Sequence, residues 1–93
     1  MKITVYATLR TKIGGKYLYF DTLKKTTARE IIRRILQQYP SLQDEIRVDQ
    51  GKFHTAFHFL VNGRDIRYLN GLDTVLTDQD DVRIFPPVGG GRA

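Results

Sequence analysis

The chain has 93 residues and contains no cysteine, with 15 Lys and Arg against 10 Asp and Glu. A chain of this length forms one modest hydrophobic core, which excludes a multi-domain enzyme. The missing cysteine excludes a disulfide scaffold, a thiolate nucleophile and a zinc-finger framework. Hydrophobic residues make up 41% of the chain, which is typical of a folded domain rather than a disordered one.

The charge is spread unevenly along the chain. Residues 1–40 carry nine basic side chains against two acidic ones, whereas residues 41–93 carry six against eight. Such asymmetry can indicate a nucleic-acid or acidic partner, but a solvated basic face is the explanation that we favour. No apolar run approaches the roughly 18–20 residues of a membrane-spanning helix, and nothing resembles a signal peptide. We therefore expect no membrane partner.

The first 22 residues predict a β-hairpin. Apolar residues alternate with polar ones over residues 2–10, which indicates a half-buried strand with Ile3, Val5, Ala7 and Leu9 on one face. Gly14 and Gly15 supply a turn, and residues 16–22 predict a second strand with Leu18 and Phe20 facing inward.

The period then changes to that of an α-helix. Apolar residues recur at helical spacing, at Ala28, Ile31, Ile32, Ile35, Leu36 and Tyr39. Thr27 and Glu30 have the spacing of a capping box at the helix start. Pro40 ends the helix, because the residue before a proline is disfavoured in the helical region.

The second half of the chain predicts further strands. Leu42 and Ile46 are expected to pack on the core, and residues 47–55 to form a polar hairpin or loop. Alternation predicts strands over 56–61 and 64–68, joined by a tight turn at Asn62 and Gly63. Residues 69–76 predict a short helical turn, 77–81 a polar turn and 82–85 a final strand. The order β-β-α-β-β-β predicts an α+β domain in two layers, with one helix across one face of a sheet.

The side chains of the domain offer little catalytic chemistry, and we predict no catalytic residue. His54 and His58 lack a third ligand, so we predict no metal site. Asp78, Asp80 and Asp81 lack the pattern of a calcium loop and are typical of a turn. An aromatic and basic surface could bind nucleic acid; it would comprise Tyr6, Tyr17, Tyr19, Lys2, Arg10, Lys12 and Lys16. We do not favour that alternative, because no recognised nucleic-acid motif accompanies the charge.

The last residues form the most unusual segment. Pro86 and Pro87 are followed by Val88, by glycine at 89, 90 and 91, and then by Arg92 and Ala93. Glycine packs nothing and is costly in entropy, so three in succession indicate a tail that enters a narrow channel, unless the end is inert. We divide the chain into a domain at 1–88 and a flexible tail at 89–93.

Three stretches resemble the MoaD/ThiS family of ubiquitin-like sulfur carriers, which includes the small subunit of molybdopterin synthase and the archaeal small modifiers. They are Val61-Asn-Gly-Arg-Asp-Ile-Arg, Leu69-Asn-Gly-Leu-Asp-Thr-Val-Leu and Asp80-Asp-Val-Arg-Ile-Phe-Pro-Pro-Val-Gly-Gly-Gly. The resemblance implies the β-grasp fold, with a mixed sheet of about four to five strands and one main helix packed across it.

The resemblance also implies chemistry at the chain's end. An E1-like enzyme would use ATP to adenylate the terminal glycine of a carrier that is itself no enzyme and binds no cofactor. The adenylate would then react with sulfur to form a thiocarboxylate, or with a target lysine to form an isopeptide. The large subunit of molybdopterin synthase is a further expected partner. The family's terminal Gly-Gly falls on Gly90 and Gly91, with Gly89 in a variable slot. We therefore expect a protease to remove Arg92 and Ala93. Because adenylation needs ATP, a cytoplasmic location is expected.

A partner-binding patch is also predicted, on the face of the sheet away from the helix. Alternation places Tyr6, His58, Leu60 and Phe85 outward, beside the tail-and-docking segment of Pro86, Pro87, Val88 and Gly89. In ubiquitin-like proteins this face binds the activating enzyme. Two alternatives stay open: a basic nucleic-acid-binding module, and a β-grasp interaction domain with an inert tail.

Overall fold

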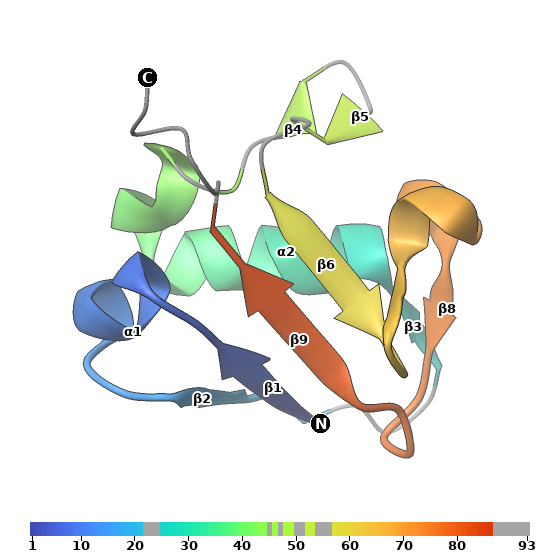
Figure 1. Ribbon diagram of the computed structural model, residues 1–93, viewed down its shortest axis with the longest axis horizontal. Helices are drawn as coiled ribbons and strands as arrows, with labels where there is room; N and C mark the ends of the chain where they lie inside the picture. The colour runs from blue at the N-terminus through green and yellow to red at the C-terminus, as the bar shows by residue number, and fades with distance from the viewer. Residues whose placement is uncertain (22–24, 45, 47, 50–51, 54–56, 87–93) are drawn as a thin grey trace.

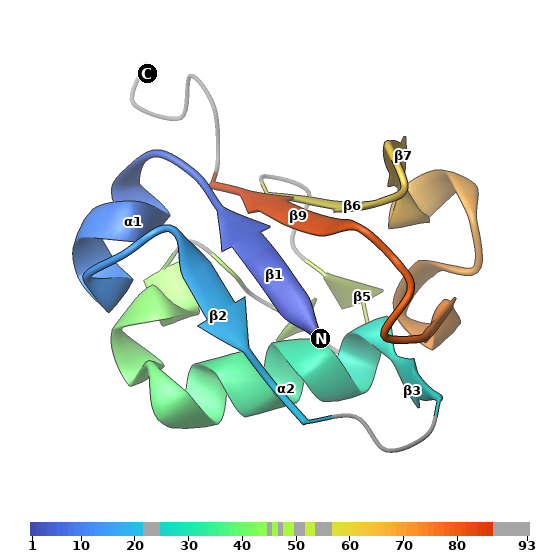
Figure 2. The ribbon, with the colours of Figure 1, turned by 90° about the horizontal axis from the view of Figure 1, so that it is seen from below.

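The computed structural model describes residues 1–21, 25–44, 46, 48–49, 52–53 and 57–86. Five strands form one sheet, in the order β2 (Tyr17–Tyr19), β1 (Lys2–Val5), β9 (Val82–Phe85), β6 (His58–Val61) and β7 (Arg64–Asp65). The central pair β1 and β9 is parallel and the other pairs are antiparallel. The long helix α2 (Ala28–Gln38) crosses one face of this sheet (Figures 1 and 2). The predicted mixed sheet with one main helix is confirmed.

Shorter elements surround this two-layer centre. A short helix, α1 (Thr8–Ile13), lies between β1 and β2, and three 3₁₀ turns follow later: η1 (Pro40–Asp44), η2 (Ile66–Tyr68) and η3 (Gly71–Asp73). Two small antiparallel pairs complete the set: β3 (Thr26–Thr27) with β8 (Val75–Leu76), and β4 (Val48–Asp49) with β5 (Lys52–Phe53). Within the part of the chain that the structure describes, no helix is long and apolar enough to cross a bilayer.

The core lies between α2 and the inner face of the sheet. Strand alternation supplies one side of it and the apolar stripe of α2 the other, as the two periods predict. All of the following are at most 3% exposed: Ile3, Val5, Leu18, Phe59, Val82, Ile84, Ala28, Ile31, Ile32 and Ile35. Leu42 and Ile46 are fully buried, which confirms their predicted packing, and Phe57 is fully buried as well.

The start of α2 follows the predicted capping pattern in part. The hydroxyl of Thr27 accepts a hydrogen bond from the backbone N–H of Glu30 at 3.2 Å. The carboxylate of Glu30 accepts two bonds from the guanidinium of Arg33, at 3.0 and 2.6 Å. These bonds hold the pKa of Glu30 below its usual value. The helix ends at Gln38, two residues before Pro40, as expected.

The prediction of a strand over residues 2–10 was wrong in its second half. Strand β1 ends at Val5, and Ala7 turns the chain with φ 55° and ψ −130°, after which α1 begins. Leu9 and Ile13 then reach the core from one side of a helix, because they are four residues apart. The predicted pairing of the first two strands is nevertheless confirmed, with Ile3 opposite Leu18.

Two later predictions need a similar correction. The return strand stops at Asp65, because the Asp65 carboxylate accepts the backbone N–H of Arg67 at 2.9 Å and begins η2. Residues 69–76 contain the predicted turn but also strand β8, which pairs with β3. The tight turn between β6 and β7 is confirmed by φ of 54° at Asn62 and 85° at Gly63. The pairing of β4 with β5 agrees with the polar hairpin.

Candidate functional site: the outer face of the sheet

The face of the sheet opposite α2 carries the predicted patch. On this face Phe85 lies directly opposite His58, and Leu60 lies between Arg83 of β9 and Asp65 of β7. Tyr6 follows β1 and reaches the same surface, where its ring stacks on Phe85. The structure therefore brings together Tyr6, His58, Leu60 and Phe85, which the strand alternation predicted to share one face.

The patch has an ordered aromatic side. The rings of Tyr6 and Phe85 are stacked, with centroids 4.2 Å apart and planes within 5°. The guanidinium of Arg10 lies 4.8 Å from the centroid of Tyr6. Arg83 donates a hydrogen bond from Nη1 to the Tyr6 hydroxyl at 2.9 Å. Hydrogen bonds to the carboxylate of Asp81 raise the pKa of Arg83.

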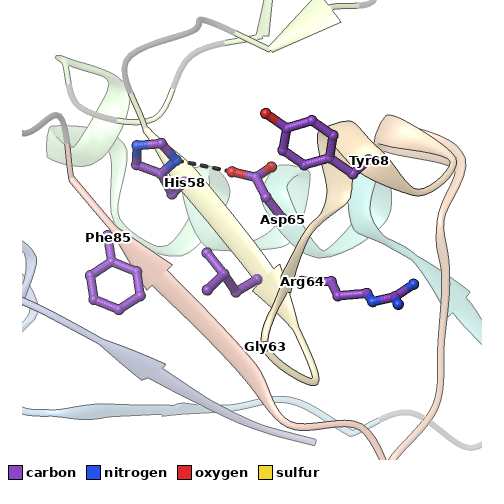
Figure 3. A pocket seen from close by; sticks show the side chains of 7 residues that line it. His58, Gly63, Arg64, Asp65, Tyr68 and Phe85 are labelled. Atoms are coloured by element: carbon purple, nitrogen blue, oxygen red, sulfur yellow. Dashed lines mark hydrogen bonds and ion pairs between the residues drawn. The ribbon is translucent and has the colours of Figure 1, made fainter.

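Beside this stack lies an open hollow of about 580 Å³ between β9, β6 and η2. Figure 3 shows Phe85 on one side of it and Tyr68 on the other. Its lining comprises His58, Leu60, Gly63, Arg64, Asp65, Tyr68 and Phe85. The ring of Tyr68 is conspicuous, because an exposed fraction of 85% is unusual for so large an aromatic side chain. A hollow with an apolar floor and aromatic walls suits an apolar side chain of a partner protein.

A polar cluster stiffens the wall of this hollow. Nδ1 of His58 and Nη1 of Arg67 lie 2.9 and 3.0 Å from the same Asp65 oxygen, Oδ2. Arg67 also donates from Nη2 to the carbonyl of Phe57 at 2.6 Å. Burial raises the pKa of Asp65, but hydrogen bonds from the Arg67 N–H and from His58, with the charge of Arg67, outweigh burial and lower it. Asp65 is therefore an anion that fastens η2 to the sheet.

The predicted tail lies largely outside the described residues. Pro86 is buried at the end of β9, whereas Pro87, Val88, Gly89, Gly90 and Gly91 are beyond the described part of the chain, as is His54. Among the residues that the structure describes, no group of three His, Asp or Glu side chains is placed to hold a metal ion. The patch thus ends where the described chain gives way to the glycine-rich segment.

Several basic residues outside the patch have local partners. On α2, Arg33 pairs with Glu30 at 2.6 Å, and Arg29 pairs with Asp73 at 3.3 Å. These pairs agree with a solvated charged face on this helix. At the far edge of the sheet, Lys2 lies over the ring of Tyr17, 4.6 Å from its centroid.

Sequence reasoning missed four residues that line the hollow, namely Gly63, Arg64, Asp65 and Tyr68. The two-residue turn at Asn62 and Gly63 could have revealed Asp65, because such a turn fixes the register and sets Asp65 opposite Leu60. Tyr68 had no comparable signal, since its position depends on η2, which replaced the predicted strand.

A five-stranded mixed sheet in the order β2-β1-β9-β6-β7, with its central pair parallel and one long helix across one face, defines the class of ubiquitin-like β-grasp proteins. The chain belongs to the ThiS family, whose model matches residues 3–91. It is similar to small archaeal modifier protein 3 of Haloferax volcanii, with 31% identity over 98% of each chain. It is also similar to a putative sulfur carrier protein of Archaeoglobus fulgidus, with 32% identity over 73% of this chain and 77% of that one.

Solved structures agree with this placement. The crystal structure of the BexX/CysO complex of Amycolatopsis orientalis contains a chain that matches with a TM-score of 0.77 and 28% identity, over 97% of this chain and 98% of that one. The β-grasp fold that the resemblance implied is confirmed. The chain is thus a ubiquitin-like carrier or modifier, a kind of protein that is not itself an enzyme.

Proposed function

We propose that this protein carries an activated acyl group at Gly91, formed when an E1-like enzyme adenylates its carboxylate with ATP. The observation that best supports the proposal is the position of the patch. Tyr6, Leu60 and Phe85 lie together on the outer face of the sheet, and Phe85 stands six residues before Gly91. An enzyme bound to this face would hold its own active site within reach of the tail.

The chemistry needs no side-chain catalyst in this chain. An oxygen of the glycine carboxylate attacks the α-phosphorus of ATP, and pyrophosphate leaves. Hydrosulfide then displaces AMP from the carbonyl to give a thiocarboxylate, or the amine of a target lysine displaces AMP and loses a proton to give an isopeptide. Because an acyl-adenylate is sensitive to water, the reacting tail must be enclosed by the partner, and glycine is slim enough for a narrow channel.

The proposal requires that Gly91 have a free carboxylate. In the sequence, Arg92 and Ala93 follow Gly91, so a peptide bond occupies the reacting position. We include a processing protease among the partners, with cleavage after Gly91. ATP belongs to the activating enzyme in this scheme, and no cofactor is assigned to this chain.

The partners follow from the same scheme. A CysO protein that matches this chain forms a complex with BexX, which supports a mode of action through a partner protein. For this chain we propose an E1-like enzyme as the first partner. The large subunit of a molybdopterin synthase and lysines of target proteins are candidate acceptors. We also propose a cytoplasmic location, because the scheme uses ATP.

Removal of the tail tests the proposal. ATP–pyrophosphate exchange by an E1-like enzyme should occur with a chain that ends at Gly91. A chain that lacks residues 90–93 should give no exchange but should still bind the enzyme, because the patch is intact. Equal exchange with both chains would contradict activation at Gly91. Loss of binding as well as exchange would contradict the separation of docking from chemistry.

A further inference from the structure

We propose that Arg10 is a positioning residue for this reaction. Acting through the ring of Tyr6, it holds Phe85 in place and so fixes the point from which the reactive tail leaves the sheet. The inference rests on the proposed function, and it assigns a role to a residue outside the docking patch.

The first observation is a three-layer stack at the end of β9. Phe85 covers one face of the Tyr6 ring at 4.2 Å, with the two planes nearly parallel. The guanidinium of Arg10 lies 4.8 Å from the same ring centroid. Because Phe85 already occupies one face, the guanidinium is left with the other, where a cation over an aromatic ring is favourable. Tyr6 is therefore held between Arg10 and Phe85.

The second observation is that Arg10 is itself held firmly. Its Nε donates to the carbonyl of Val5 at 2.7 Å, and Val5 lies beside Ile84 in the parallel pair of β1 and β9. The carbonyl of Arg10 accepts the N–H groups of Gly14 and Gly15, at 2.9 and 3.1 Å. The side chain of Arg10 is thus hydrogen-bonded to β1, which adjoins β9, and the backbone of Arg10 is hydrogen-bonded to the residues that end α1.

The local fold explains how Arg10 reaches this position. Tyr6 and Arg10 are four residues apart, with a chain reversal at Ala7 between them. The reversal begins α1, in which Leu9 is buried and anchors the helix on the core. The buried Leu9 and the hydrogen bond from the Arg10 N–H to the Ala7 carbonyl, at 3.0 Å, fix the direction of the next side chain. Arg10 then turns back over Tyr6.

The end of β9, from which the tail leaves the sheet and which we call the tail root, is held on two further sides. Arg83 donates to the Tyr6 hydroxyl and is itself bound by Asp81, with Nε 3.1 Å from Oδ2. His58 lies directly opposite Phe85 on the neighbouring strand, and Pro86 is buried. The last two described residues, Phe85 and Pro86, therefore have a defined position before the glycine-rich segment begins.

A fixed root matters because the reaction depends on orientation. Extended chain spans at most roughly 3.3–3.6 Å per residue, so Gly91 can be delivered only within about 17 Å of Pro86. A shift of Phe85 displaces the start of this segment relative to an enzyme docked on the sheet. A displacement of about 1 Å can already cost a large factor in the rate of a reaction between bound groups. Loss of the stack should consequently slow adenylation more than it weakens docking.

The first part of the test needs no enzyme. Proton NMR spectra of the wild type, Arg10→Ala, Arg10→Lys and the matched control Arg29→Ala should be compared. The Tyr6 ring shifts the Phe85 ring protons, so Arg10→Ala should move the Phe85 signals toward unstacked values, whereas Arg29→Ala, on the outside of α2, should not. Unchanged Phe85 signals in Arg10→Ala would overturn the proposal.

The second part separates positioning from docking. In adenylation by an E1-like enzyme, with chains ending at Gly91, Arg10→Ala should lower kcat about tenfold. Because Tyr6 and Phe85 also belong to the docking patch, the Kd of the complex should rise as well, but by a smaller factor than kcat falls. Arg10→Lys keeps a cation for the Tyr6 ring and should recover part of kcat; Arg29→Ala should match the wild type. A raised Kd with unchanged kcat would show that Arg10 contacts the enzyme directly and would overturn the proposal. No adenylation with the wild type would overturn the proposed function, with the NMR result still reporting on the stack.

Discussion

The two faces of the central sheet use the same strands for different purposes. On β9, Val82 and Ile84 point to the helix and are fully buried, whereas Arg83 and Phe85 point outward and remain in part exposed. On β6, Phe59 and Val61 face inward, and His58 and Leu60 face outward. The inner face is aliphatic and aromatic throughout, and the outer face mixes aromatic, aliphatic and charged groups. Neighbouring residues on one strand therefore have different roles. The inner ones stabilise the fold, and the outer ones are available to partners.

The largest expected effect belongs to the inner face. Ile84→Ala should lower the free energy of unfolding by about 3 kcal/mol, because it removes buried methyl groups and leaves a cavity between β9 and α2. Urea unfolding followed by circular dichroism measures the change. Val75→Ala is the matched control, since Val75 is 52% exposed, and should stay within about 0.5 kcal/mol. A loss below about 1 kcal/mol for Ile84→Ala would contradict the division between the faces.

The next effect concerns the outer face. Leu60→Asp should weaken docking on the activating enzyme by about 2 kcal/mol, or roughly 30-fold, because it places a charge at the centre of the apolar patch. The domain should stay folded, as monitored by its thermal transition. Leu60→Asn introduces a side chain of the size of Asp but without its charge. The comparison separates the loss of apolar contact from repulsion by Asp65 across the strand pair. Unchanged adenylation with both variants would remove the patch from the account.

A third prediction concerns backbone strain at Ala7, just after the end of β1. Ala7 has a positive φ, which only glycine adopts freely. Its side chain is exposed, so little packing is lost when it is removed. Ala7→Gly should therefore raise the free energy of unfolding by about 1 kcal/mol, as measured by urea unfolding. A clear destabilisation would show that the turn is relaxed and that its conformation does not depend on Ala7.

A fourth prediction asks whether polar groups outside the core also stabilise the fold. Asp80 accepts hydrogen bonds from the N–H of Thr77 at 2.8 Å and from Asn62 at 3.0 Å, and these bonds lower its pKa. Because the folded pKa is depressed, this stabilisation is present above the usual value near 3.8. It is lost as the pH falls through the folded pKa, since the unfolded chain binds the proton first.

Asp80→Asn tests this effect. The variant should lose about 1 kcal/mol at pH 7, and its difference from the wild type should shrink as the pH falls below the usual value. Urea titrations at several pH values measure both quantities. A difference that stays constant down to the lowest pH would show that the charge of Asp80 contributes nothing.

The alternation of residues along β6 and β9 was sufficient to predict which side chains share the outer face. Phe85, Leu60 and His58 are placed correctly because a buried strand in a two-layer fold allows only one assignment of faces. The long helix was predicted for the same reason, since its apolar stripe has one period and a proline ends it. Periodicity thus predicts faces well wherever one face is fully buried.

Contacts between distant parts of the chain were not predictable in this way. The alternation over residues 2–10 continued through Leu9, although Leu9 reaches the core from a helix. The position of Arg10 over the ring of Tyr6 was therefore not predicted. The bond between Arg83 and Tyr6 joins residues 77 positions apart, and the hollow depends on where η2 sets Tyr68. These features follow from the packing of several elements, which no local pattern contains.

The central claim is that this domain is activated at Gly91. Intact-mass spectrometry tests it directly, after incubation of the chain ending at Gly91 with ATP, an E1-like enzyme and a sulfur donor. We expect the mass of an adenylate and then the mass of a chain in which sulfur replaces one carboxylate oxygen. In the presence of a target protein, we expect the mass of a conjugate. A chain of unchanged mass, with none of these three products, would contradict it.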